Sequence, residues 1–294
     1  MGRDTQTGQT CGGNGSRHAI AFMLISTVSL SVHAVVIKSL SASYDVSEIT
    51  TVRYALQLAI ALLVNPRSIA QLVLIRQPLL HALAATLILC QTVLFSIAII
   101  YIPMSSATAA LSTAPLIVVM LAKWTLGETV GLYRWIAVGL GMFGALLIAK
   151  PGLESEHWAI FVAFGGAMAV ALFHLSTRSL ARCEDPASSI AYMSLVCFSI
   201  CSLSWSDSWR LPVSMTDLAA FLALGVTGWI GHSFVLKAME LAQASTLVPL
   251  NYTQLIAVSV LGYLFFAQIP DLWTLTGAAI IAGSGILCAS ARHA

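Results

Sequence analysis

The sequence predicts an all-α integral membrane protein whose ten transmembrane helices form two five-helix repeats of opposite orientation. Three observations support this prediction: an apolar composition, apolar runs of membrane-spanning length, and a match between the two halves of the chain. Of the 294 residues, 58% are apolar and only 9% are charged, whereas about a quarter of the residues of a soluble domain are charged. A chain of this composition is expected to have the lipid bilayer as its solvent.

The apolar runs predict helices. Each is long enough to cross ~30 Å of hydrocarbon at about 1.5 Å per residue, and the sequence lacks the alternating pattern of a transmembrane β-barrel. Residues 1–17 are polar and rich in glycine, so we expect them to form a disordered cytoplasmic tail. The expected spans are residues 19–39, 47–64, 79–100, 104–123, 130–149, 158–177, 187–205, 217–236, 244–266 and 271–289.

The basic residues predict the topology. Ten of the fourteen Lys and Arg residues lie in the tail or in segments that follow even-numbered spans, three lie in the opposite loops, and Arg53 lies inside a span. Because basic residues accumulate on the cytoplasmic side, both termini are predicted to be cytoplasmic. Arg53 is about two turns inside the second span, where we expect its long side chain to reach the lipid headgroups rather than act as a gate.

A shift of 140 residues overlays the two halves without a gap. It pairs Lys38-Ser39-Leu40 with Arg178-Ser179-Leu180 and Asp45 with Asp185, and the apolar spans stay in register. The predicted repeats are residues 18–150 and 157–290. Five helices per repeat is an odd number, so the second repeat enters the membrane from the opposite side. In transporters, an inverted repeat of this kind places the substrate site near the bilayer midplane between the halves.

Several classes of function are disfavoured. A net charge of +2 without a long basic run offers no footprint for a nucleic acid. The six cysteines include no CxxC pair, so the sequence supports neither a zinc site nor a disulfide framework, and no metal or cofactor is expected. The sequence has no P-loop, no G-x-S-x-G elbow and no Asp or Glu at mid-depth of a span. These features disfavour ATP-driven transport and intramembrane hydrolysis.

Residues 101–149 carry a recognisable pattern: a Ser/Ala-rich helix with a mid-helix Pro115, a Gly127-Glu128 turn, and a closing helix dotted with glycines. This pattern resembles the second part of an EamA-type repeat. The equivalent stretch, residues 241–289, departs from it, because Ala267-Gln268 replaces Gly-Glu and Leu255 replaces the proline. The whole chain is similar to the ten-helix branch of the drug/metabolite transporter superfamily, and in particular to bacterial exporters of amino acids.

The resemblance implies a bacterial inner-membrane carrier, proton-driven or facilitated, that works by alternating access. It also implies a cavity lined mainly by helices 1, 3, 4, 6, 8 and 9.

The stretch "LNYTQLIAV", residues 250–258, holds the strongest candidates for that cavity. Unsatisfied polar groups are costly in hydrocarbon, and Asn251 and Gln254 share one face near the centre of a span. Tyr252 lies to one side and is expected to flank the same cavity, while Thr113 is a polar group in the corresponding stretch of the first half. Hydrogen bonding between helices is the alternative role for these residues.

Other spans add polar candidates. Gln91 is at the centre of the third span, and its partner region in the eighth span contains Trp229 and His232. Ser29 and His33 lie on one polar stripe of the first span. His232 and His33 are candidates for carrying a proton because imidazole changes charge near physiological pH; a buried neutral histidine with one partner is the alternative. Packing is the alternative for Trp229 and Ser29.

His174 is not among the cavity candidates. His174 lies near a helix end and is expected to reach the membrane interface.

The expected function is outward secondary transport of small metabolites, amino acids foremost, with the direction implied by the resemblance. The expected partners are a small-molecule substrate, the lipid bilayer and protons as candidate coupling ions. Because the predicted cavity contains no fixed charge, neutral zwitterions are favoured over anionic solutes. A membrane-embedded enzyme, or a protein that modifies or flips lipids, is the alternative; an enzyme would need a reactive group at one membrane surface, and none is evident.

Overall fold

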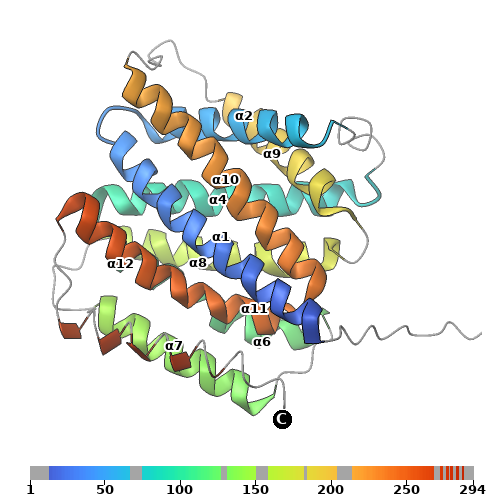
Figure 1. The fold of residues 1–294 in the computed structure, drawn as a ribbon, viewed down its shortest axis with the longest axis vertical. Helices are drawn as coiled ribbons and strands as arrows, with labels where there is room; N and C mark the ends of the chain where they lie inside the picture. The colour runs from blue at the N-terminus through green and yellow to red at the C-terminus, as the bar shows by residue number, and fades with distance from the viewer. Residues whose placement is uncertain are drawn as a thin grey trace, which may run out of the picture.

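The structure is a computed structural model, and it describes residues 13–66, 75–126, 131–149, 158–181, 184–203 and 214–267, with short segments between 272 and 287. Every regular element in these ranges is a helix (Figure 1). Residues 13–17, which were expected in the tail, are helical; the rest of the tail lies outside the described residues. Six helices are long and apolar enough to cross a membrane, and three shorter apolar helices accompany them in the described ranges.

The first nine predicted spans each coincide with helical structure. The tenth, residues 271–289, lies largely outside the described residues and remains a prediction. The elements of the first half are α1 (Gly13–Leu40), α2 (Val46–Val64), α4 (Pro78–Tyr101), α5 (Met104–Leu111), α6 (Ala114–Leu126) and α7 (Leu132–Ala149). Those of the second half are α8 (Ala159–Leu180), α9 (Pro186–Ser202), α10 (Met215–Leu241), α11 (Ala244–Leu247), the 3₁₀-helix η1 (Val248–Asn251) and α12 (Tyr252–Phe266).

Helix boundaries in the two halves recur 140 residues apart. α1 and α8 end at Leu40 and Leu180, and α6 and α12 end at Leu126 and Phe266. The starts of α2 and α9 also correspond, since each follows an aspartate. The Asp185 carboxylate accepts a hydrogen bond from the Ser188 backbone N–H, and the Asp45 N–H donates to the Glu48 carboxylate. N-terminal capping by Asp therefore starts the same helix in both halves.

The fourth span of each half is broken, although the sequence predicted continuous helices there. Residues 112–113 form a turn between α5 and α6, and η1 separates α11 from α12. Pro115 and Pro249 supply a physical reason, because proline lacks an N–H and clashes with the preceding helical turn. Irregular backbone at membrane depth is tolerated where it is buried in protein or lines a cavity.

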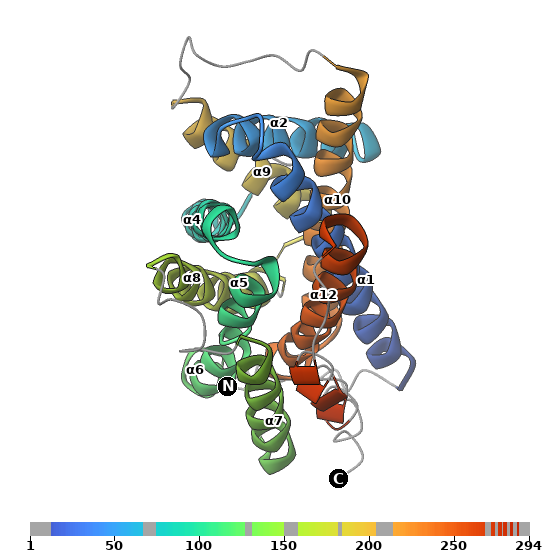
Figure 2. The same ribbon diagram turned by 90° about the vertical axis from the view of Figure 1, so that its left-hand side faces the viewer.

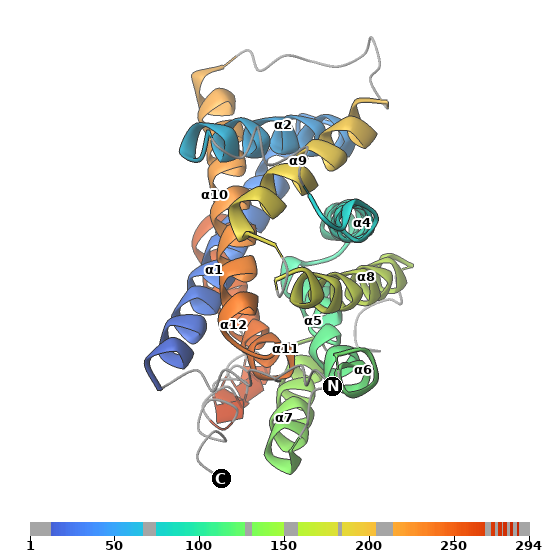
Figure 3. The same ribbon diagram turned by 90° about the vertical axis from the view of Figure 1, so that its right-hand side faces the viewer.

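The halves interlock instead of forming separate bodies. α1 packs along α10, and α4 packs along α8. These two contacts are equivalent, because α8 is the counterpart of α1 and α10 is the counterpart of α4. α2 packs against α9, its own counterpart. Figures 2 and 3 show α4 and α8 close to end-on along one side, opposite α1, α10 and α12. The space between these two groups is where a site shared by both halves can form.

Candidate substrate cavity

A cavity lies between the two halves, and residues of α1, α2, α4, α5, α6, α8, α10, η1 and α12 line it. Its lining repeats the 140-residue relation, so equivalent positions of the two halves contribute to the same cavity. Seven pairs of lining residues are 140 positions apart: Leu30 and Val170, His33 and Phe173, Ala34 and His174, Thr92 and His232, Phe95 and Val235, Leu111 and Asn251, and Ala114 and Gln254.

Arg53 of α2 supplies a cation to the cavity wall. Its guanidinium donates from Nη1 to Thr92 Oγ1 at 2.9 Å and from Nη2 to His232 Nε2 at 2.8 Å. Thr92 and His232 are equivalent positions on α4 and α10, so one side chain bridges the two halves. No Asp or Glu in the described ranges forms an ion pair with Arg53. Because Nε2 accepts the hydrogen bond, His232 is a neutral imidazole with its proton on Nδ1.

Two expectations about Arg53 are wrong. The side chain does not reach the headgroups, since only 2% of its surface is exposed and it faces α4 and α10. The cavity also contains a fixed charge, which removes the argument that favoured neutral zwitterions. A charged residue inside a membrane costs at least about 2.5–3.5 kcal/mol at the helix centre, so a charge kept there calls for a partner or a function.

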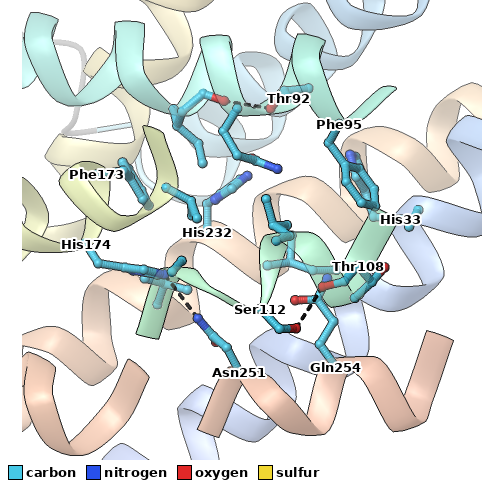
Figure 4. A pocket seen from close by; sticks show the side chains of 18 of the residues that line it. His33, Thr92, Phe95, Thr108, Ser112, Phe173, His174, His232, Asn251 and Gln254 are labelled. Atoms are coloured by element: carbon cyan, nitrogen blue, oxygen red, sulfur yellow. Dashed lines mark hydrogen bonds between the residues drawn. The ribbon is translucent and has the colours of Figure 1, made fainter. Parts of the chain in front are cut away.

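Asn251 and Gln254 lie across the cavity from Thr92 (Figure 4). The Asn251 side-chain Nδ2 donates to His174 Nε2 at 3.1 Å. His174 is 3% exposed and lines the cavity, so the expectation that it reaches the membrane interface is wrong. The side-chain amides of Gln254 and Gln91 also line the cavity, and within the described part of the chain neither has a hydrogen-bond partner.

Four of the nine residues expected in the cavity lie elsewhere, and three of them are Ser29, Thr113 and Trp229. Ser29 Oγ donates to the Thr227 carbonyl of α10 at 2.9 Å. Thr113 Oγ1 donates to the carbonyl of Ala110, three residues earlier in its own turn, at 2.9 Å. Trp229 packs against the hydrophobic core. None of the three lines the cavity, so their alternative roles in packing and hydrogen bonding fit the structure better.

Tyr252 is the fourth predicted residue outside the cavity. Its ring is fully buried against α7, where its hydroxyl donates to the Val138 carbonyl at 3.3 Å. A Cβ atom on Gly141 would lie 2.3 Å from the ring, so the two helices meet this closely only because residue 141 is a glycine. Tyr252 therefore fastens α12 to α7 and does not flank the cavity.

The other five predicted residues, Gln91, His232, His33, Asn251 and Gln254, do line one cavity. The sequence analysis placed Arg53 and His174 at the membrane surface and did not consider Thr92, yet all three line the cavity. A signal for Thr92 was present, since it is 140 positions before His232. Arg53 had no such signal, because its counterpart is Met193.

A smaller hollow adjoins the main cavity behind Ile88, Phe173 and His232, which line both. Its other walls are mainly apolar and include Met193 and Cys197. Within the described ranges, no group of three or more His, Cys, Asp or Glu residues could hold a metal ion. The described lining offers hydrogen-bonding side chains and one guanidinium.

A family model matches the chain twice, over residues 17–150 and 157–290, and its description is "EamA-like transporter family". The chain belongs to this family. The expected resemblance is thus confirmed, and the two matches are themselves 140 residues apart. Members of the EamA-like family are transporters, so the chain is a multi-pass membrane transporter and not an enzyme.

Three curated relatives are named for transport of different substrates. An S-adenosylmethionine uptake transporter of Rickettsia conorii is 26% identical over 262 residues, covering 89% of each chain. A pseudopaline exporter of Pseudomonas aeruginosa is 26% identical over 277 residues, covering 90% of this chain and 93% of the relative. A riboflavin transporter of Vibrio cholerae is 27% identical over 180 residues, covering 61% and 60%. Small-molecule transport is common to all three.

A solved crystal structure superposes on the chain with a TM-score of 0.77 and covers 94% of it, at 15% sequence identity. At that identity the match shows a shared fold alone.

Proposed function

We propose that the chain is a secondary transporter that moves amino acids or their small derivatives outward across the bacterial inner membrane by alternating access. The observation that carries this proposal is the cavity between the halves, where the amides of Gln91 and Gln254 have no protein partner in the described residues. Such groups are suited to bind a polar solute and release it again, because the solute replaces no existing hydrogen bond.

The chemistry of the cavity fits this substrate class. The polar wall suits an amino and a carboxyl group, and the apolar part of the lining, which includes Phe95 and Phe173, suits an apolar side chain. One relative is an S-adenosylmethionine transporter. S-adenosylmethionine is a derivative of the amino acid methionine, which favours this substrate class for the present chain.

The test is counterflow in proteoliposomes that contain only this protein. Vesicles are loaded in turn with each of the twenty amino acids, riboflavin or a quaternary amine, and entry of the labelled compound is followed. We expect saturable counterflow of at least one amino acid. Flux of riboflavin or the amine without any amino acid would contradict the proposed substrate class, while lipid movement between leaflets without solute flux would favour the flippase alternative.

The topology is part of the proposal. Two repeats, residues 18–150 and 157–290, lie in the membrane in opposite orientations with both termini in the cytoplasm, as the ten-to-three distribution of basic residues suggests. Reporter fusions after Arg17 and after Glu154 should report opposite sides of the membrane. Reports from the same side would contradict the inverted relation of the repeats.

We further propose that His232 does not carry a coupling proton. Protonation at Nε2 would remove the lone pair that accepts from Arg53, and it would place a second positive charge beside the guanidinium. The variant His232→Gln retains an acceptor oxygen, so transport should keep its pH dependence between about pH 5.5 and 7.5, where a free imidazole titrates. A flattened profile in His232→Gln, with an unchanged profile in His33→Gln, would assign the proton to His232.

A further inference from the structure

Arg53 has more hydrogen-bonding capacity than its protein partners use. A guanidinium presents five N–H donors in a planar fork, and the two hydrogen bonds of Arg53 go to Thr92 and His232. Both partners are neutral, so neither compensates the charge. The Nε atom is buried and has no partner in the described structure. Arg53 lines the cavity, and its Nη1 and Nη2 atoms each carry a second N–H that the bonds to Thr92 and His232 do not use.

The surroundings leave the charge without a protein counter-ion. Among the cavity-lining residues that the structure describes, Arg53 is the one Lys or Arg, and no Asp or Glu is present. The Tyr54 ring lies 4.7 Å from the guanidinium carbon and shields one side. Gly228 of α10 passes close by, since a Cβ there would lie 3.4 Å from Arg53 Nε. The site is thus built closely around a cation and lacks an anion.

We propose that Arg53 binds the carboxylate of the transported solute. A carboxylate accepts two parallel N–H bonds from a guanidinium fork, and a charge-assisted pair of this kind is stronger than a bond between neutral groups. The substrate class is therefore a metabolite with a carboxylate at one end and hydrogen-bonding groups that reach Asn251 or Gln254 across the cavity. This inference rests on the proposed transport function and narrows it.

The position of Arg53 also links carboxylate binding to the arrangement of the two halves. Because its guanidinium already bridges equivalent positions of α4 and α10, a carboxylate held there lies where the two halves meet. Any rearrangement that separates Thr92 from His232 changes the donors around that carboxylate. Substrate binding is thereby linked to the relative position of the halves, as alternating access requires.

The experiment measures binding without transport. Thermal unfolding of the full chain in detergent is followed with 4-methylpentanoate or 3-phenylpropanoate, and with the matching neutral amides. These probes isolate the carboxylate because they carry no amino group. We expect the acids to raise Tm by roughly 5 °C at a hundredfold excess over Kd, and the amides to raise it far less. Equal shifts by acid and amide on the wild type would overturn the proposal.

The variant Arg53→Gln should weaken acid binding about 10- to 100-fold and leave amide binding unchanged. The matched control is Arg178→Gln, which removes an arginine of α8 whose guanidinium donates to the Met239 carbonyl outside the cavity; it should keep the preference for acids. If Arg53→Gln does not fold, Arg53→Lys replaces it: lysine keeps the charge without the fork, so the preference should shrink, and an unchanged preference would overturn the proposal.

The outcome separates this inference from the proposed function. Preference for acids together with no amino-acid counterflow would refute the amino-acid substrate and leave Arg53 as a carboxylate site. Amino-acid counterflow without any preference for acids would refute the role of Arg53 and leave the transport function intact.

Discussion

The two halves of the chain provide the same positions to the cavity but different chemistry at those positions. The second half places Asn251, Gln254 and His174 where the first half has Leu111, Ala114 and Ala34. In the opposite sense, the first half supplies Arg53, whose counterpart Met193 lines the apolar hollow. A symmetric backbone suits a carrier that opens alternately to two sides. A solute without two-fold symmetry requires an asymmetric wall, and side chains provide it.

The largest expected effect comes from giving the second half the residues of the first. Gln254→Ala introduces the counterpart of Ala114 and removes an amide without a protein partner in the described residues. We expect a loss of apparent substrate affinity of about tenfold, and up to about a hundredfold where the amide meets a charged group of the solute. Stability should be unchanged. Counterflow kinetics and thermal unfolding in detergent measure the two quantities.

Thr113→Ala is the control, because Thr113 Oγ1 donates within its own turn and lies outside the cavity. It should leave affinity unchanged. If Gln254→Ala instead lowers Tm while the remaining folded protein transports with wild-type affinity, the amide is structural and the site is misplaced.

A second test addresses packing, since the fully buried Tyr252 stands where the first half has Ser112. Gly141→Ala places a Cβ 2.3 Å from the Tyr252 ring, and the ring is held by its hydrogen bond to Val138. We expect a loss of stability of about 1–3 kcal/mol from overpacking, with no change in substrate affinity. Gly139→Ala is the matched control, because nothing lies within 4 Å of its Cβ position. Equal unfolding temperatures for the two variants would contradict the packing role of Tyr252.

The hydrogen bond between Asn251 and His174 is a further difference between the halves, because the first half has Leu111 and Ala34 at these positions. Asn251→Leu should reduce both affinity and stability, since it leaves His174 Nε2 without its donor. A double-mutant cycle with His174→Ala should show a coupling of about 0.5–1.5 kcal/mol in stability. Additive effects in the cycle would show that the 3.1 Å contact contributes nothing to stability.

The smallest expected effect is at the end of α12. Ala267 adopts a left-handed conformation with φ of 52°, and the first half has Gly127 at the equivalent position. An L-residue in this conformation costs roughly 1–2 kcal/mol relative to glycine. We therefore expect Ala267→Gly to stabilise the protein by about 1 kcal/mol without changing transport. A lower Tm for Ala267→Gly would contradict this account.

Much of the fold followed from local chemistry. Apolar runs of bilayer length predicted the helices, and the 140-residue shift predicted which helices correspond. Five of the nine expected site residues line one cavity, because a polar group at mid-span has few places to point except the protein interior. The breaks beside Pro115 and Pro249 were missed, since proline within a long span is also compatible with a kinked but continuous helix.

The membrane environment, the helices and their repeat could be predicted because they depend on composition and spacing along the chain. The direction in which each polar side chain faces depends on how the helices pack. Tyr252 and Gln254 are two residues apart in sequence, yet one packs on α7 and the other lines the cavity. Arg53 has the reach to extend to the headgroups or to bind Thr92 and His232. The packing of α2 against α9 and α10 turns it inward, and no property of one isolated helix specifies that choice.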